Sequence, residues 1–261
     1  MKTYYENKLN YNQISFCLTN KPKIDEREIH SYHEILLYFD GDVELFTVNG
    51  HRTLKEHSLL IIPAETYHLL KPEKIPGFKR LKISFPADAF KNTPLAEIMS
   101  EFKVVDNFSE ELKIIFNKLS EVLRENRKNA AFYAYSAFLM LISELDMHHT
   151  DYDGKNPDFE NSLMGRVAEY ISANLSKNLD IKTLAEQVHI SPSGITHRFK
   201  KEFGIPIHKY IMQKRLVYAK RLVEEGKQLT KIYSDVGFKD YSSFYKAYVN
   251  YFGYEPSRDK K

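Results

Sequence analysis

The feature that most limits how this chain can fold is an internal repeat in its C-terminal half. The segment Ile181–Gly204 can be laid over the later segment Leu229–Gly253 so that apolar residues coincide. At an offset of 48 residues, Leu184, Ala185, Val188 and Ile190 match Ile232, Tyr233, Val236 and Phe238. At an offset of 49 residues, Ile195, Phe199, Phe203 and Gly204 match Phe244, Tyr248, Phe252 and Gly253. Each copy predicts two short helices that are joined by a turn and closed by a glycine, which is the helix-turn-helix plan.

Short-range signals predict where these helices begin. Ser191 is a good N-cap, and Pro192 suits the first helical position, where a missing N–H costs little. Asp240 predicts the N-cap of a helix over Tyr241–Phe252. Between the two copies, Ile205–Gly226 predicts one long helix. We expect four basic side chains of that helix to stay solvated: Lys214, Arg215, Lys220 and Arg221.

The second helix of each copy has an outward face that could touch a ligand. In the first copy this face carries Ser193, Thr196 and His197, with Arg198, Lys200 and Lys201 beside it. In the second copy, Ser242, Ser243 and Lys246 project from the opening turns of the helix, on the side away from Phe244 and Tyr248. Charge is also divided unevenly, because residues 161–261 hold 18 Lys and Arg against 10 Asp and Glu, whereas residues 1–160 hold 20 against 25. This asymmetry favours a basic module that binds a polyanion.

These motifs resemble a known family. The segment from about Val167 to Arg258 is similar to the DNA-binding domain of the AraC/XylS family of bacterial transcription regulators, through "LAEQVHISPSGITHRFKKEFG" and "IYSDVGFKDYSSFYKAYVNYFGYEPSR". The resemblance implies that both recognition helices enter consecutive major grooves of double-stranded DNA. By position it implies base contacts from Ser193, Thr196, His197, Ser243 and Lys246. It also implies RNA polymerase as a partner, and we expect Arg198, Lys200, Lys201 and Lys214 to contact phosphates.

The first 85 residues predict short β-strands. Asp40-Gly41 and Asn49-Gly50 are two-residue hairpin signals, and Phe78–Phe85 predicts the last strand. Many short strands with tight turns indicate a sandwich or barrel. After Pro86, two amphipathic helices are predicted over about Phe108–Arg127 and Asn129–Met147, and their aromatic-rich stripes predict a homodimer.

A polar linker is predicted over His148–Asp158. The predicted fold class is therefore α+β with two domains, residues 1–150 and residues 159–261, and the second domain should fold alone. Through "HSYHEILLYFDG" and "LLIIPAETYH", the first half resembles the usual partner of the AraC/XylS DNA-binding domain, a cupin-like ligand-sensing barrel followed by dimerisation helices.

Histidines in the first half raise the question of a metal site. His30, His33, Glu34 and His68 offer imidazole and carboxylate ligands. However, adjacent residues of a strand point to opposite faces, so His33 and Glu34 cannot both line one interior. We therefore predict no metal and no cofactor, and instead a small-molecule pocket lined by His30, Glu34, Tyr38 and His68.

Two other functions compete with a DNA-binding regulator: a cupin-type metal-dependent enzyme with a helical appendage, and a protein-interaction module that has lost DNA binding. The chain contains none of the common nucleotide-binding or hydrolase motifs, so we expect no enzyme. Its one cysteine, Cys17, is expected to be an inert core residue. The N-terminus lacks an apolar run, and no stretch is long enough to span a membrane, so a cytoplasmic protein is expected.

Overall fold

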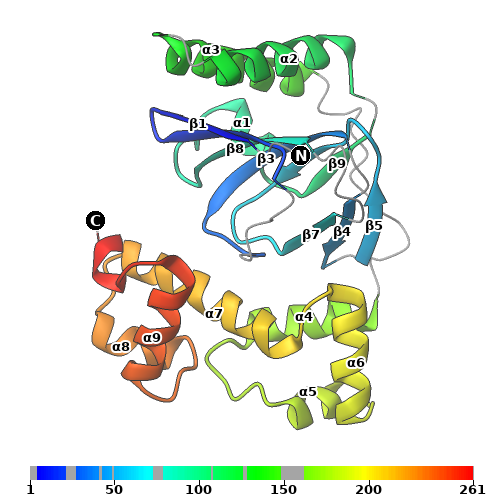
Figure 1. The fold of residues 1–261 in the computed structure, drawn as a ribbon. Helices are drawn as coiled ribbons and strands as arrows, with labels where there is room; N and C mark the ends of the chain where they lie inside the picture. Colours follow the sequence, from blue (N-terminus) through cyan, green and yellow to red (C-terminus); the bar gives the residue numbers. More distant parts are fainter. Residues whose placement is uncertain are drawn as a thin grey trace.

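The computed structural model describes residues 5–21, 28–40, 43–48, 50–72, 79–106, 108–125, 128–147 and 162–260. Its N-terminal part combines sheets with three helices, and its C-terminal part is helical (Figure 1). The predicted two-domain α+β class is confirmed. The predicted linker, His148–Asp158, lies outside the described residues. None of the described helices is long and apolar enough to cross a membrane.

The strands of the first domain form two antiparallel sheets. Their bounds are β1 Glu6–Tyr11, β2 Ile14–Thr19, β3 Tyr32–Asp40, β4 Val43–Thr47, β5 Gly50–Leu54, β6 Leu59–Ile62, β7 His68–Pro72, β8 Lys79–Pro86 and β9 Lys103–Val105. The large sheet has the order β1-β2-β8-β3-β6-β9 and the small sheet has the order β5-β4-β7. In the described chain no ladder joins the two sheets, so the expected closed barrel is not observed.

Two of the turn and strand predictions need correction. β4 and β5 form the hairpin expected at Asn49-Gly50, with Thr47 opposite Gly50. The signal at Asp40-Gly41 does not close a hairpin, because β3 pairs with β6 and β8 while β4 belongs to the small sheet. Gly41 itself lies outside the described residues. Phe78–Phe85 is also not the last strand, since β9 follows β8 and pairs with β6.

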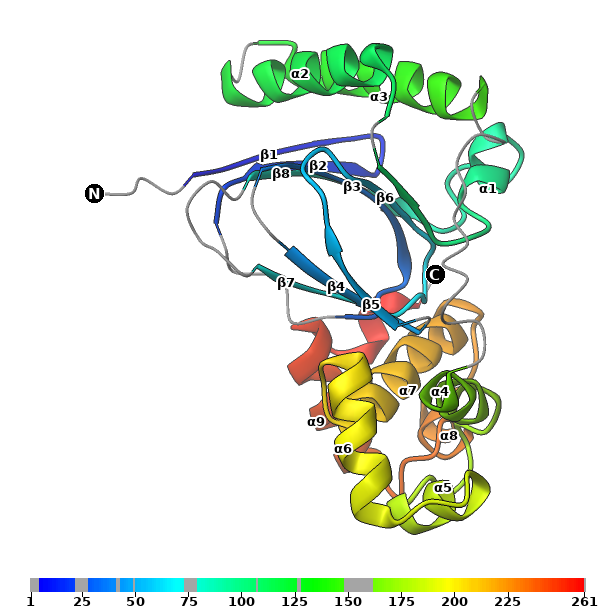
Figure 2. The same cartoon turned by 90° about the vertical axis from the view of Figure 1, so that its right-hand side faces the viewer.

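Strict alternation along the strands gives the large sheet two different faces. On β3, Ile35 and Leu37 pack toward the helices, whereas Leu36 and Tyr38 pack toward the small sheet. The helices α1 (Pro94–Ile98), α2 (Glu110–Glu125) and α3 (Ala130–Met147) belong to the first of these layers. Figure 2 shows α2 and α3 lying across the outer face of the large sheet.

The second domain contains the two helix-turn-helix copies that the sequence repeat predicts. Its helices are α4 Leu163–Ala173, α5 Ile181–Gln187, α6 Pro192–Phe203, α7 Ile207–Glu224, α8 Leu229–Asp235 and α9 Tyr241–Phe252, followed by a 3₁₀ helix at Pro256–Asp259. Ser191 and Asp240 cap α6 and α9 as predicted, each accepting from the backbone N–H three residues later. Both helices end at a glycine in the left-handed region, Gly204 and Gly253.

The turns inside the two motifs are also equivalent. Ile190 N–H donates to Ala185 O, and Phe238 N–H donates to Tyr233 O, 48 residues later. The residue at the bend has positive φ in both copies, 53° at His189 and 83° at Gly237. The bends of the two helix-turn-helix motifs therefore share this hydrogen bond and a positive φ, although the side chains there differ.

The two domains share one hydrophobic core. The core of the first helix-turn-helix motif, which includes Phe199 and Phe203, also contains four residues of the N-terminal domain: Ile29, Phe46, Tyr67 and Leu69. The Tyr67 hydroxyl donates to Phe203 O. Packing against the N-terminal domain therefore supports the helix that is expected to read DNA.

Candidate nucleic-acid interface and the neighbouring polar cluster

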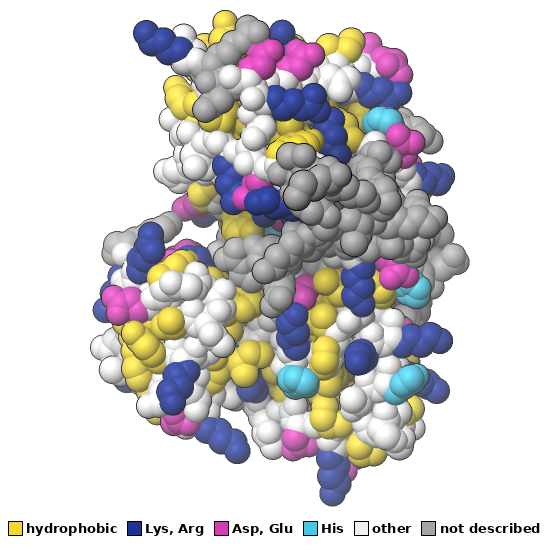
Figure 3. Space-filling model, in the orientation of Figure 1, with side chains coloured by type: hydrophobic (Ala, Val, Ile, Leu, Met, Phe, Trp, Pro, Cys, Tyr) yellow, Lys and Arg dark blue, Asp and Glu magenta, His cyan; other side chains and the backbone are white. Residues whose placement is uncertain are grey.

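The outward face of α6 is exposed although the helix contacts β4 and β5. Ile195, Phe199 and Phe203 are buried, and the six predicted DNA-contacting residues on this helix are all exposed: Ser193, Thr196, His197, Arg198, Lys200 and Lys201. Figure 3 shows Lys and Arg side chains spread over the surface of the helical domain. The Thr196 hydroxyl donates to Pro192 O at 2.9 Å, which leaves its lone pairs to accept from a base.

α9 presents a similar face. Ser242, Ser243 and Lys246 are exposed, while Phe244 and Tyr248 are fully buried. The Ser243 hydroxyl donates to Asp240 at 2.8 Å, so this side chain is held by its own N-cap.

Two further exposed residues of α9 are candidate DNA contacts that the sequence motifs did not single out. The 49-residue offset makes Tyr245 the counterpart of Thr196 and Asn250 the counterpart of Lys201. Both side chains are exposed beside Lys246. The offset itself could have identified them, since it relates every position of α6 to one of α9.

The prediction that four basic residues of α7 stay solvated is wrong for Lys214, Arg215 and Lys220, which are partly buried. Lys214 donates to Glu65 O at 3.1 Å and so contacts the N-terminal domain rather than an open phosphate site. Lys220 pairs with Asp259. Arg221 remains exposed and contacts Glu65.

Arg215 connects the two helix-turn-helix motifs. Its Nε donates to Leu175 O at 3.0 Å and its Nη2 donates to Lys177 O at 2.8 Å, both in the segment that follows α4. A Cβ added at Gly237 would lie 2.3 Å from Leu175 O and 2.6 Å from Arg215 Nη2. The bend of the second motif therefore lies directly against this contact, which positions α6 and α9 relative to one another.

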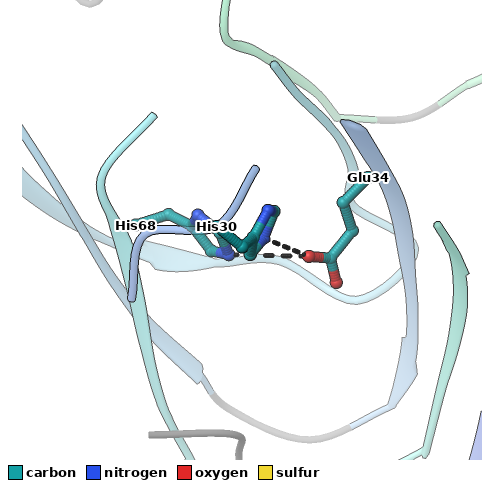
Figure 4. Close-up of side chains that lie close together, drawn as sticks. All are labelled: His30, Glu34 and His68. Carbon is teal, nitrogen blue, oxygen red and sulfur yellow. Dashed lines mark ion pairs between the residues drawn. The ribbon is translucent and has the colours of Figure 1, made fainter. Parts of the chain in front are cut away.

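A buried polar cluster lies where the N-terminal domain meets the helices. His30 precedes β3, Glu34 lies on the inner face of β3 and His68 begins β7 (Figure 4). The Glu34 Oε2 atom is 2.7 Å from His30 Nε2 and 3.7 Å from His68 Nε2. His33 points away, as predicted, and accepts from Ala64 N–H at 3.0 Å. Three of the four predicted pocket residues thus converge.

Burial and charge define the protonation states in this cluster. Burial opposes ionisation of Glu34, but Lys82, His30 and His68 outweigh it, so the pKa of this carboxyl lies well below its usual range. Burial and the neighbouring His30 lower the pKa of His68 to about 4. His68 is therefore a neutral imidazole and Glu34 a carboxylate at neutral pH.

Tyr38, the fourth predicted pocket residue, lies two residues beyond Leu36 on the same face of β3, opposite Arg80. Burial raises the pKa of its hydroxyl, against the lowering effect of Arg80. Cys17 is buried, and burial raises the pKa of its thiol, in agreement with the inert role predicted for it.

A cavity of about 1290 Å³ opens between the two domains. The inner face of the large sheet contributes Cys17, Arg80 and Lys82, and the helical domain contributes Lys220 and Tyr251. His30 lines it, whereas Glu34, Tyr38 and His68 do not form part of its wall. Of the four predicted pocket residues, His30 belongs to both this cavity and the buried cluster, Glu34 and His68 belong to the cluster alone, and Tyr38 belongs to neither.

Comparisons with known proteins agree with the helical motifs. Residues 184–261 match the model of a helix-turn-helix domain. The chain is 22% identical to the Msm operon regulatory protein of Streptococcus mutans over 81% of this chain and 80% of that protein. It is 25% identical to the uncharacterized HTH-type transcriptional regulator YobQ of Bacillus subtilis, over 87% and 85% respectively.

A crystal structure of ToxT from Vibrio cholerae O395 aligns over 98% of both chains, with a TM-score of 0.43 and 12% identity. The paired motifs and the sequence relatives define a transcription regulator with two helix-turn-helix units. Its C-terminal part, residues 184–261, carries the helix-turn-helix domain of such regulators, and its motifs resemble those of the AraC/XylS family.

Proposed function

We propose that this regulator inserts α6 and α9 into two successive major grooves on one face of DNA. The observation that supports this most directly is the repeated backbone of the two motifs, each with an exposed second helix. The 18 residues of α7 span about 27 Å. Successive major grooves on one face are about 34 Å apart, a separation that two recognition helices flanking α7 could match.

In this proposal, base edges are read by Ser193, Thr196 and His197 on α6 and by Ser242, Ser243, Tyr245 and Lys246 on α9. Arg198, Lys200 and Lys201 contact phosphates, which position the protein without reading sequence. The lone pairs of the Thr196 and Ser243 hydroxyls are suited to accept from adenine or cytosine amino groups. RNA polymerase is the further partner that the family resemblance implies. Because its proposed target is DNA, we also propose that the protein acts in the cytoplasm.

Selection of duplexes by the purified protein, followed by binding of variants, tests this proposal. His197→Ala should weaken binding to the selected duplex by about 1–3 kcal/mol and relax preference at one base pair. Lys200→Ala should weaken binding to selected and scrambled duplexes equally and lower the salt slope by roughly one. Thermal melts should show both variants folded. A His197→Ala protein that binds both duplexes as the parent does would show that α6 is not a reader.

We further propose a boundary between residues 150 and 159 and a ligand-sensing, cupin-like role for the N-terminal domain. The cavity between the domains supports control by a small molecule, because its wall contains cationic groups from both sides, such as Arg80 and Lys220. A ligand held there would contact the sensor and the DNA-binding domain at once.

The exposed surface of α2 and α3 supports a homodimer. Large apolar side chains are exposed on the side of these helices away from the sheet: Ile114, Phe132, Tyr133, Leu139, Met140 and Met147. Tyr133, Met140 and Met147 recur every seven residues and so share one face. A lysine in the middle of a buried apolar contact would be desolvated, so Met140→Lys should raise the dimer dissociation constant at least about tenfold.

Sedimentation of the full chain at tens of micromolar measures this effect. The matched control is Met212→Lys, because Met212 is also exposed but lies on α7. A parent chain that is strictly monomeric in this range would refute the dimer.

A further inference from the structure

The buried cluster of His30, Glu34 and His68 has the composition and arrangement of a metal site. One ligand atom from each residue lies within 4.8 Å of the other two, and each side chain is buried. Ligands at about 2.0–2.1 Å in a tetrahedral site are roughly 3.3 Å apart. The observed separations of 2.7 Å and 3.7 Å from Glu34 Oε2 to the two imidazoles lie on either side of that value. Small side-chain rotations would therefore bring all three atoms to bonding distance of one ion.

Both histidines are held with the correct nitrogen directed at the cluster. His30 Nδ1 is 2.8 Å from Tyr32 O, and His68 Nδ1 is 3.2 Å from Thr66 O. A carbonyl oxygen only accepts, so each Nδ1 carries a proton and each Nε2 is directed at Glu34. Metal-binding histidines are typically oriented by such second hydrogen bonds. His30 Nε2 is buried and lies 2.7 Å from Glu34 Oε2.

We propose that His30, Glu34 and His68 bind one divalent first-row transition-metal ion, and that the bound ion controls DNA binding. Imidazole and carboxylate together suit Zn²⁺, Fe²⁺, Mn²⁺ and Co²⁺ rather than Mg²⁺ or Ca²⁺, which prefer all-oxygen sites. Three protein ligands leave a fourth position for water or another ligand. His30 also lines the cavity between the domains, which gives the ion a route from solvent.

The positive charge of Lys82 opposes binding of a metal cation at Glu34. Lys82 Nζ lies 3.8 Å from Glu34 Oε1, on the oxygen that does not face the histidines. Its positive charge weakens the attraction of Glu34 for a second cation. Replacing Lys82 by methionine removes this charge and keeps most of the apolar stem, so Lys82→Met should tighten metal binding. That gain distinguishes a site at Glu34 from binding elsewhere on the surface.

The cluster is joined to the DNA-binding domain through residues 28–30 and 65–68, here called the junction segments. They pair with each other, since Glu65 N–H donates to His30 O at 2.7 Å and His68 N–H donates to Glu28 O at 2.9 Å. The Glu28 carboxylate accepts from Lys209 at 2.7 Å and from Gln213, both on α7. The Tyr251 hydroxyl of α9 donates to Ile29 O.

An ion bound by His30 and His68 would connect one junction segment to the other. It would therefore fix the surface on which α7 and α9 rest. This regulatory half of the proposal rests on the proposed DNA-binding function, whereas the metal site does not.

Binding of Zn²⁺, Mn²⁺ and Co²⁺ to the tag-free full chain, measured by equilibrium dialysis with Mg²⁺ as control, tests the site. We expect one ion per chain and a Co²⁺ absorption spectrum typical of nitrogen and oxygen ligands. His68→Ala and Glu34→Gln should raise Kd by more than about 100-fold, beyond the loss that follows removal of a supporting partner. The matched control is His51→Ala, an exposed histidine of the same domain. No binding of any of the three ions, or equal binding by Glu34→Gln, His68→Ala and the parent, would overturn the site.

Affinity for the selected duplex, measured with and without the bound ion, tests the regulation. We expect a change of at least about fivefold, and by linkage the duplex should change the metal Kd by the same factor. The His68→Ala protein should bind the duplex with an affinity independent of metal. Equal affinities of metal-free and metal-loaded parent would overturn the regulatory link. A parent that selects no duplex in either state would refute the proposed function, while dialysis would still decide the metal site.

Discussion

Replacing Phe199 by alanine should lower the free energy of unfolding by about 3–5 kcal/mol. The ring is fully buried, stacks on Phe203 with centroids 4.1 Å apart and meets Tyr210 edge-on at 5.3 Å. Truncation leaves a cavity in the core that both domains share, and neither α6 nor the sheet beside it can close such a void without moving. Urea unfolding of the full chain, monitored by circular dichroism, measures the loss.

The control is His197→Ala, two residues earlier on the exposed face of the same helix. It should change the unfolding free energy by no more than about 0.5 kcal/mol. A loss below about 1 kcal/mol for Phe199→Ala would show that the site collapses easily and that the packing described for α6 does not stabilise it.

Gly237→Ala should destabilise the protein by about 2–5 kcal/mol in total. The residue has a φ of 83°, which costs about 1–2 kcal/mol for a residue with a Cβ. The added Cβ would also lie 2.3 Å from Leu175 O, the carbonyl that accepts from Arg215. The turn or the segment after α4 must therefore move, which adds a cost of overpacking of about 1–3 kcal/mol.

Gly226 provides a control that isolates the strain. It has a similar φ of 81°, but a Cβ there would meet nothing within 4 Å. Thermal unfolding of both variants should thus show only about 1–2 kcal/mol for Gly226→Ala. Equal losses for the two substitutions would mean that the close approach to Leu175 contributes nothing.

Much of the helical domain could be predicted from the sequence because its signals are local. Ser191, Pro192 and Asp240 set helix starts through contacts within a few residues, and the repeat offsets located both motifs. The interactions of the α7 cations could not be predicted in this way. Lys214 and Arg215 bond to carbonyls 149 and 40 residues earlier in the chain, and no pattern within one helix reveals such partners.

The polar cluster shows the same limit. The alternation rule correctly separated His33 from Glu34, and on that ground the sequence argued against a metal site. The rule applies within a strand, but His30 lies in the segment before β3 and His68 lies on another strand. Their convergence on Glu34 depends on how that segment and β7 are placed across the interior, which only tertiary structure determines. Likewise, the two-sheet arrangement depends on long-range pairing that the turn signal at Asp40 did not reveal.

The contact of Arg215 with Leu175 and Lys177, with Gly237 packed against it, has a consequence for the DNA that this protein would recognise. Each base pair inserted between two half-sites turns the second half-site by about 34–36° around the duplex axis. Two recognition helices joined by a flexible linker could follow that rotation. In this protein, however, α6 and α9 are positioned relative to each other by this contact. In the proposed binding mode the operator must keep its two half-sites in one helical phase, so the spacing between them is as much a part of the recognised sequence as the bases themselves.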